Sequence, residues 1–164
     1  MKTIYLRLVK GSGLYDRIIG WYTRSLYTHA EFSWPLDNAR PQGWLGAQPK
    51  GGVEIRNWDY LTAPFDLFAV SVTYKEYALI EAWLKGQIGK PYAWKAIFNM
   101  GVFEHDVTSA DKWFCSELVF AAFEKYDVEI LRAPLSQRDR ITPRDLGLSI
   151  ILKPVRFNKI TDNK

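Results

Sequence analysis

Runs of β-branched and aromatic residues, and one segment that alternates apolar and polar positions, predict a series of β-strands in the first half of the chain. Residues 3–9 are rich in β-branched and aromatic side chains, and glycines at positions 11 and 13 end this strand. Residues 28–34 alternate strictly, so His29, Glu31 and Ser33 are expected on one face of a strand and the apolar residues between them on the other. Further strands are predicted over residues 44–47, 52–56, 65–72 and 148–155.

Apolar residues at the helical period predict the helices, most of them in the second half. The apolar period begins at Leu14 and predicts a first helix that ends near Ser25, and a second helix ends near Gly89-Lys90-Pro91. A helix from Cys115 to Lys125 is expected to turn one apolar face inward, and Thr142-Pro143 begins a short helix because proline is favoured at the first helical position. A shorter helix is predicted over residues 92–100, and residues 35–41 and 101–111 are predicted to be loops, the second of which carries His105.

Strands followed by helices, with a last strand that returns to the sheet, predict an α+β domain with a mostly antiparallel sheet packed against helices. The chain has 164 residues, of which 48% are hydrophobic, enough for one core. We expect a single domain over residues 1–158 and a flexible tail over residues 159–164.

Composition narrows the class of function. The net charge is +4, but the basic residues are scattered and interrupted by acids, so nucleic acid is not an expected partner. One cysteine excludes an internal disulfide framework, and neither a metal site nor a cofactor is expected from the spacing of the potential ligands. Arg7 and Lys10 interrupt any signal peptide, and no apolar run approaches the ~20 residues of a membrane helix. A soluble cytoplasmic protein is expected, and export by a specialised machine or release by lysis would leave no mark in the sequence.

The chemistry suggested by the pattern centres on Cys115, which begins an apolar helical stripe. Unpaired backbone amides and the helix dipole at such a position favour a thiolate, and the amide of Cys115 could stabilise a developing oxyanion. Ser116 and Glu117 follow directly, which is typical of a rim rather than a sealed core. The alternative is that Cys115 is a small core residue, as most lone cysteines on an apolar helical face are.

A base and an orienting acid are available on the predicted strand 28–34. Only His29 and His105 are histidines, and His105, flanked by two acids in a loop, is interpreted as a solvated surface residue. Glu31 lies about 6.5 Å along the same face as His29, close enough to accept a ring N–H and stabilise an imidazolium. The alternative is that His29, Glu31 and Ser33 form the wet face of an edge strand.

Three segments resemble the NlpC-type papain-like cysteine hydrolases: Tyr27-Thr28-His29-Ala30-Glu31-Phe32, Gly89-Lys90-Pro91-Tyr92-Ala93-Trp94 and Trp113-Phe114-Cys115-Ser116-Glu117-Leu118-Val119. Histidine precedes cysteine, as in the circularly permuted members, which include bacterial and phage proteins and the lecithin:retinol acyltransferase group. The resemblance spans nearly the whole chain and implies a permuted papain-like fold.

Carried over by position, the resemblance makes Cys115 the nucleophile, His29 the base and Tyr92 a residue near the oxyanion site. The family's third polar residue falls on Gly46, which has no side chain. This departure leaves Glu31 as the expected orienting group, with Gln48 as the reserve; Gln48 and Ser116 join Tyr92 as candidate oxyanion or substrate-binding residues.

The expected function is therefore a thiol hydrolase that forms an acyl-enzyme, and the resemblance implies an amide of a cell-wall peptide as its substrate. One alternative is a lipid acyl hydrolase or acyltransferase of the same fold. Another is a non-catalytic virion or interaction module that retains the fold. The oligomeric state is left open.

Overall fold

A six-stranded antiparallel sheet forms the centre of the computed structural model, which describes residues 1–11, 13, 17, 20–21, 24–93, 111–133 and 140–156. The strand order is β4-β3-β2-β1-β5-β6, and every neighbouring pair is antiparallel. The strands are β1 (Lys2–Val9), β2 (His29–Trp34), β3 (Gly43–Gln48), β4 (Gly52–Asn57), β5 (Phe65–Val72) and β6 (Lys153–Val155). The coarse α+β prediction is thus confirmed.

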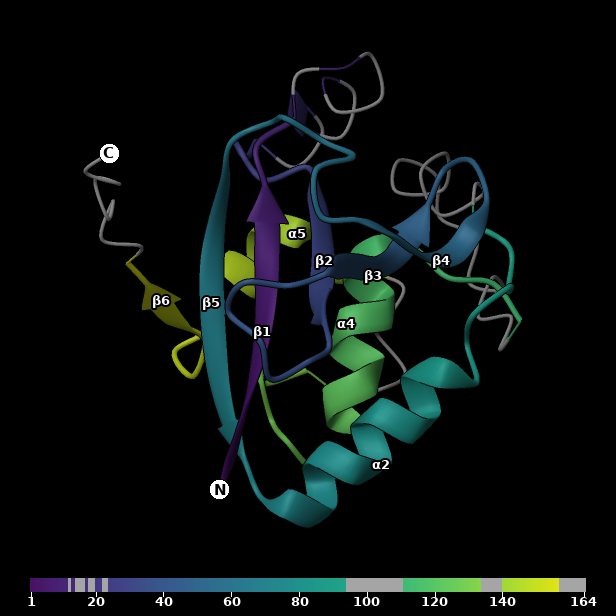
Figure 1. The fold of residues 1–164 in the computed structure, drawn as a ribbon. Coiled ribbons are helices and arrows are strands. Elements are labelled where there is room, and N and C mark those ends of the chain that lie inside the picture. Colours follow the sequence, from purple (N-terminus) through teal and green to yellow (C-terminus); the bar gives the residue numbers. More distant parts are fainter. Residues whose placement is uncertain are drawn as a thin grey trace, which may run out of the picture.

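The first strand is central, because the chain pairs it with β2 on one side and with β5 on the other (Figure 1). Its register with β2 places Arg7 directly opposite Glu31 and Val9 opposite His29. Directly opposed residues of an antiparallel pair share a face, so this register brings Arg7 and Glu31 together.

Two helices carry end signals that the sequence shows. Helix α2 (Tyr74–Lys85) begins with a capping box in which Thr73 accepts from the amide of Glu76 and the Glu76 carboxylate accepts from that of Thr73. Helix α5 (Pro143–Gly147) has Thr142 as its N-cap and proline in its first turn. Helix α4 (Cys115–Glu124) confirms the helix predicted from Cys115.

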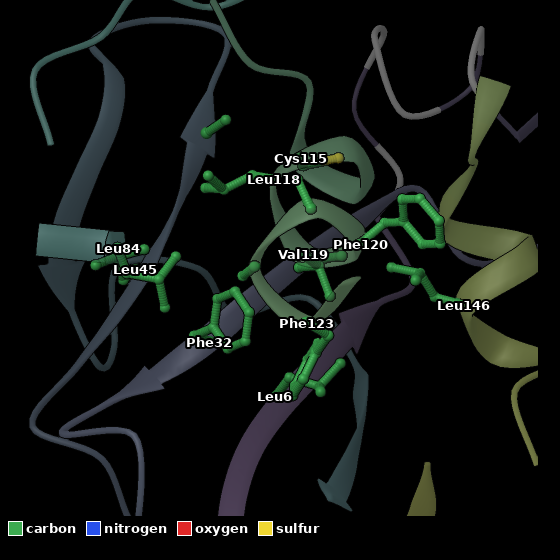
Figure 2. Close-up of a cluster of buried hydrophobic side chains, with 14 of the residues drawn as sticks. Leu6, Phe32, Leu45, Leu84, Cys115, Leu118, Val119, Phe120, Phe123 and Leu146 are labelled. Atoms are coloured by element: carbon green, nitrogen blue, oxygen red, sulfur yellow. The ribbon is translucent and has the colours of Figure 1, made fainter. Parts of the chain in front are cut away.

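The core lies between one face of the sheet and α4, with α2 and α5 packed beside α4 (Figure 1). Alternate residues of β1 and β2 supply apolar side chains, among them Leu6 and Phe32. Figure 2 shows these side chains against Phe123, while Cys115 lies at the other end of α4. Helix α4 is more buried than the single apolar face predicted from its sequence, since every residue from Cys115 to Phe123 is buried.

Two predicted elements were wrong in part. The strand expected over residues 148–155 is confined to Lys153–Val155, because α5 runs on into a turn in which the amides of Leu148 and Ser149 bond back to α5. The helix expected over residues 92–100 does not begin at Tyr92, which instead forms a parallel bridge with Trp113.

Several predictions fall largely outside the described residues. Of the helix predicted from Leu14 to Ser25, Arg17, Gly20 and Trp21 are helical. Residues 94–100, the loop with His105 and the tail 159–164 lie outside the described ranges, so those predictions stay predictions.

Candidate active site

The polar face of β2 is buried, which makes the wet edge-strand interpretation wrong. Strand β2 lies between β1 and β3. His29 is 9% exposed, and Glu31 and Ser33 have no exposed surface. Polar side chains at such positions require partners, because burying an unpaired polar group or charge costs several kcal/mol. The contacts of these residues therefore define a candidate site.

Cys115 is the first residue of α4, as predicted. The amide of Phe114, the preceding residue, donates to the Glu117 carboxylate at 3.3 Å, and the first intrahelical bond runs from the Leu118 amide to the Phe114 carbonyl. The first-turn amides of Cys115 and Ser116 thus lie at a helix start, where backbone N–H groups lack helical acceptors. The Cys115 side chain has no solvent-accessible surface.

The imidazole of His29 lies between the Cys115 thiol and the Glu31 carboxylate. Its Nε2 is 3.4 Å from Oε1 of Glu31, an ion-pair contact rather than an aligned hydrogen bond. The thiol lies within hydrogen-bonding range of the same ring. Elements far apart in the sequence, β2 and α4, therefore bring the predicted pair together.

Opposing effects act on the charge of this imidazole. Burial alone lowers the pKa of His29, but the negative charges of Cys115 and Glu31 outweigh burial and raise this pKa to about 10. The protonated ring is therefore favoured when the sulfur is a thiolate. Proximity of these groups is what an imidazolium–thiolate pair requires.

Glu31 is held from several sides. Arg7 approaches Oε2 with Nε at 2.7 Å and Nη2 at 2.5 Å. Tyr60 donates its hydroxyl to Oε1 at 2.6 Å, and Gln48 donates its amide to the same oxygen at 2.5 Å. Burial alone raises the pKa of Glu31, but the charges of His29 and Arg7 and the hydrogen bonds lower this pKa to about 2. The carboxylate is therefore ionised.

Gln48 does not take the place of Glu31 beside the His29 ring but supports the Glu31 carboxylate. Its amide bonds Glu31 and, at 3.0 Å, the Tyr60 hydroxyl. Both candidates for the orienting group therefore belong to one chain of contacts: Gln48 bonds Glu31, and Glu31 contacts His29. Tyr60 was missed by the sequence reasoning, since it lies in the segment between β4 and β5 and belongs to no motif.

Gly46, where the family pattern called for a polar side chain, provides the space for Glu31. Phe32 pairs with Leu45, so the next position along both strands brings Glu31 opposite Gly46. A Cβ on Gly46 would lie 2.8 Å from Cγ and 3.3 Å from Oε1 of Glu31. The carboxylate from β2 therefore occupies the volume that a side chain on β3 would fill.

Arg7 is the second residue that the sequence reasoning missed. Its charge was read only as an interruption of a signal peptide, although a lone arginine between Leu6 and Leu8 in an apolar strand is itself a signal of a buried partner. It has no exposed surface, and its guanidinium lies 4.0 Å from the Trp44 ring centroid. Buried arginine requires a partner, and Glu31 provides one.

Tyr92 and Ser116 lie close to Cys115 in different ways. The Tyr92 ring packs against Phe114, the residue before Cys115, at a centroid distance of 5.7 Å. Ser116 is fully buried and donates its hydroxyl to the Ile141 carbonyl at 2.6 Å. The Ser116 side chain therefore joins α4 to the segment before α5, and the expected rim position of Ser116 and Glu117 is wrong because both are buried.

Among the described residues, no group of three or more potential ligands could hold a metal ion. No helix within those ranges has the length and apolar character needed to cross a bilayer.

No protein-family model matches the chain, and no curated protein matches its sequence. The fold is similar to the crystal structure of the metalloprotein YiiX from Escherichia coli O157:H7, a DUF1105 protein, with a TM-score of 0.61 and 15% sequence identity. The match covers 94% of this chain and 96% of that chain. At this identity the likeness shows a shared fold and nothing about activity.

Proposed function

We propose that the protein is a cysteine hydrolase with a circularly permuted papain-like fold, in which Cys115 is the nucleophile, His29 the base and Glu31 the orienting group. The observation that carries the proposal is the position of one imidazole between a thiol at a helix start and a buried, ionised carboxylate. This order of nucleophile, base and orienting acid is the arrangement that defines a catalytic triad by geometry.

In the proposed reaction, His29 accepts the thiol proton and the sulfur attacks the substrate carbonyl carbon. The oxyanion that forms is stabilised by the backbone N–H of Cys115 at the start of α4. As the carbon–nitrogen bond breaks, the imidazolium donates its proton to the leaving amine, which leaves an acyl-thioester. Water, deprotonated by His29, then attacks the thioester; the acid is released, and the proton returns to the sulfur.

The substrate we propose is an amide in a cell-wall peptide, on the basis of the sequence resemblance. Tyr92, whose ring packs against Phe114, is kept as the proposed residue near the oxyanion site. The name of YiiX, a metalloprotein, is said of that protein alone, and the described part of this chain has no group of three or more His, Cys, Asp or Glu side chains that could hold a metal ion.

The burial of the thiol favours a second candidate, a non-catalytic module that retains the fold. Cys115 has no accessible surface, so any substrate reaches the sulfur only when the atoms around it move. A structural cysteine would have the same burial. The two candidates differ in whether the thiol reacts from the folded protein and whether His29 governs that reaction.

Alkylation with iodoacetamide across pH distinguishes these candidates. The wild type, His29→Ala and, as the unreactive control, Cys115→Ser are compared by mass spectrometry, with the global unfolding rate measured in parallel. We expect the wild type to react well below pH 8 and faster than it unfolds, and the alanine variant to need a higher pH. A thiol that reacts only at the unfolding rate, or a profile unchanged in His29→Ala, supports the non-catalytic module.

Substrate class is tested separately with cell-wall muropeptides and fatty-acyl esters, using Cys115→Ser as the control. Release of an amine from the muropeptides that depends on Cys115 supports the proposal. Turnover of the acyl esters alone would assign the site to a lipid acyl hydrolase or acyltransferase.

A further inference from the structure

Arg7 is a buried charge in the middle of the central strand. It lies between Leu6 and Leu8, both core residues, and has no exposed surface. Removing a guanidinium from water costs several kcal/mol even after relaxation, and a hydrophobic residue is often at least as stable at such a position. A stability role alone therefore gives little reason for arginine here.

The surroundings of Arg7 hold its guanidinium in one place. The register of β1 and β2 sets it opposite Glu31. Its carbon Cζ lies 4.0 Å from the Trp44 ring centroid and 5.3 Å from those of Tyr60 and Phe65. Aromatic rings at these distances attract a cation and also exclude water from it. Arg7 is thus aimed at the carboxylate and is screened little by solvent.

The two carboxylate oxygens of Glu31 have different partners. Arg7 takes Oε2, through Nε and Nη2. Oε1 is left for His29, Gln48 and Tyr60. The carboxyl plane is therefore defined by Arg7 on one side and by the imidazole on the other.

Arg7 also determines which protonation state of the Glu31–His29 pair is favoured. In a buried pair, the proton can lie on the imidazole, giving two charges, or on the carboxyl, giving none, and burial favours the neutral form. A cation at 2.5–2.7 Å from Oε2 stabilises the ionised carboxylate, and it lies farther from the imidazole, which it repels less. The arginine thus shifts the pair toward carboxylate and imidazolium.

We propose that Arg7 is a positioning residue of the site, which keeps Glu31 ionised and turned so that Oε1 faces His29. This inference rests on the proposed function, because a positioning residue has a role only in a catalytic site. The effect of Arg7 on the charge of His29, however, is measured without any substrate. The inference concerns the protonation state of His29 and the orientation of Glu31, and not which bond is cleaved.

Few groups can alter this charge state. Among the described residues, those facing Glu31 are Arg7 from β1, His29 from β2, Gln48 from β3 and Tyr60 from the segment after β4. Cys115 from α4 is the other charged group that interacts with the imidazole. Burial and the charge of Glu31 raise the pKa of Tyr60, so that side chain stays neutral. Gln48 does not titrate.

The test follows the His29 imidazole by nitrogen-15 NMR across pH in the full chain, where only His29 and His105 give histidine signals. In Arg7→Met we expect the titration midpoint of His29 to fall by about one pH unit or more, because Glu31 takes up the proton. Arg7→Lys should restore most of the shift by returning the charge. The control is Lys2→Met, which removes a cation of the same strand from its partly exposed pair with Asp37 and should leave His29 unchanged.

A double-mutant cycle separates the positioning role from a structural one. If Arg7 acts through Glu31, Arg7→Met should cause no further shift in the titration midpoint of His29 when Glu31→Gln is already present. The double variant removes one positive and one negative charge, and this balance helps it to fold. A folded Arg7→Met with an unmoved His29 midpoint would overturn the proposal, as would equal shifts in both backgrounds. An unreactive Cys115 would refute the proposed function and leave this measurement intact.

Discussion

Placing a methyl group on Gly46 tests whether the position of Glu31 controls the site. A Cβ there would lie 2.8 Å from Glu31 Cγ, whereas carbon atoms in ordinary contact are separated by about 3.5–4.0 Å. Gly46 does not have a positive φ, so alanine introduces no backbone strain at this position. The variant therefore acts through this contact, and Glu31 must move by roughly 1 Å.

The expected losses of stability and reactivity in Gly46→Ala follow from this displacement of Glu31. Glu31 cannot swing away freely, because Arg7, Tyr60 and Gln48 hold its carboxylate. Overpacking of this kind costs about 1–3 kcal/mol, and the reduced freedom of the unfolded chain offsets about 0.4–1 kcal/mol of it. If Glu31 orients the base as proposed, a misplacement near 1 Å lowers the rate of the catalysed reaction on the order of a hundredfold. We expect Gly46→Ala to lose far more reactivity than stability.

The assay is the alkylation rate of Cys115 at pH 7, with urea unfolding measured on the same samples. Gly43→Ala is the matched control, because a Cβ there would lie 2.6 Å from the Arg56 carbonyl oxygen on the opposite face of β3. It should destabilise the protein at least as much and leave alkylation unchanged. The reasoning is refuted if Gly46→Ala, still folded, keeps the wild-type rate, or if both variants lose reactivity in proportion to stability.

Three further predictions concern the same network. Glu31→Gln should slow turnover more than Gln48→Ala, because only Glu31 contacts His29; the reverse ranking in steady-state rates would assign the orienting role to Gln48. Ser116→Ala should lower the free energy of unfolding by about 1–2 kcal/mol through loss of the bond to the Ile141 carbonyl, and the alkylation profile should not move. The folded pKa of Glu31, about 2, is below its ordinary value of 4.5, so its stabilisation is present above pH 4.5 and is lost as the pH falls toward 2. Urea unfolding at pH 7 and pH 3 should show a smaller pH effect in Glu31→Gln than in the wild type.

Much of the fold follows from local pattern. Strand β5 has the bounds predicted from its run of strand-forming residues, and α4 and α5 begin at the predicted residues, because the signals for each element lie within a few residues of each other. The predicted last strand failed where Leu148 and Ser149 turn back to α5. Apolar residues there satisfy a strand pattern and a turn equally well, and only the neighbouring helix distinguishes them.

By itself, the sequence determined which side chains could act together: a thiol at a helix start, and a histidine and a glutamate on one face of a strand. It could do so because helix starts and strand faces depend on residue spacing alone. Tertiary structure alone decided that this face is buried, that Gly46 leaves room for Glu31, and that Arg7 holds the carboxylate. These outcomes depend on which strands become neighbours, and strand pairing joins residues whose separation along the chain carries no local signal.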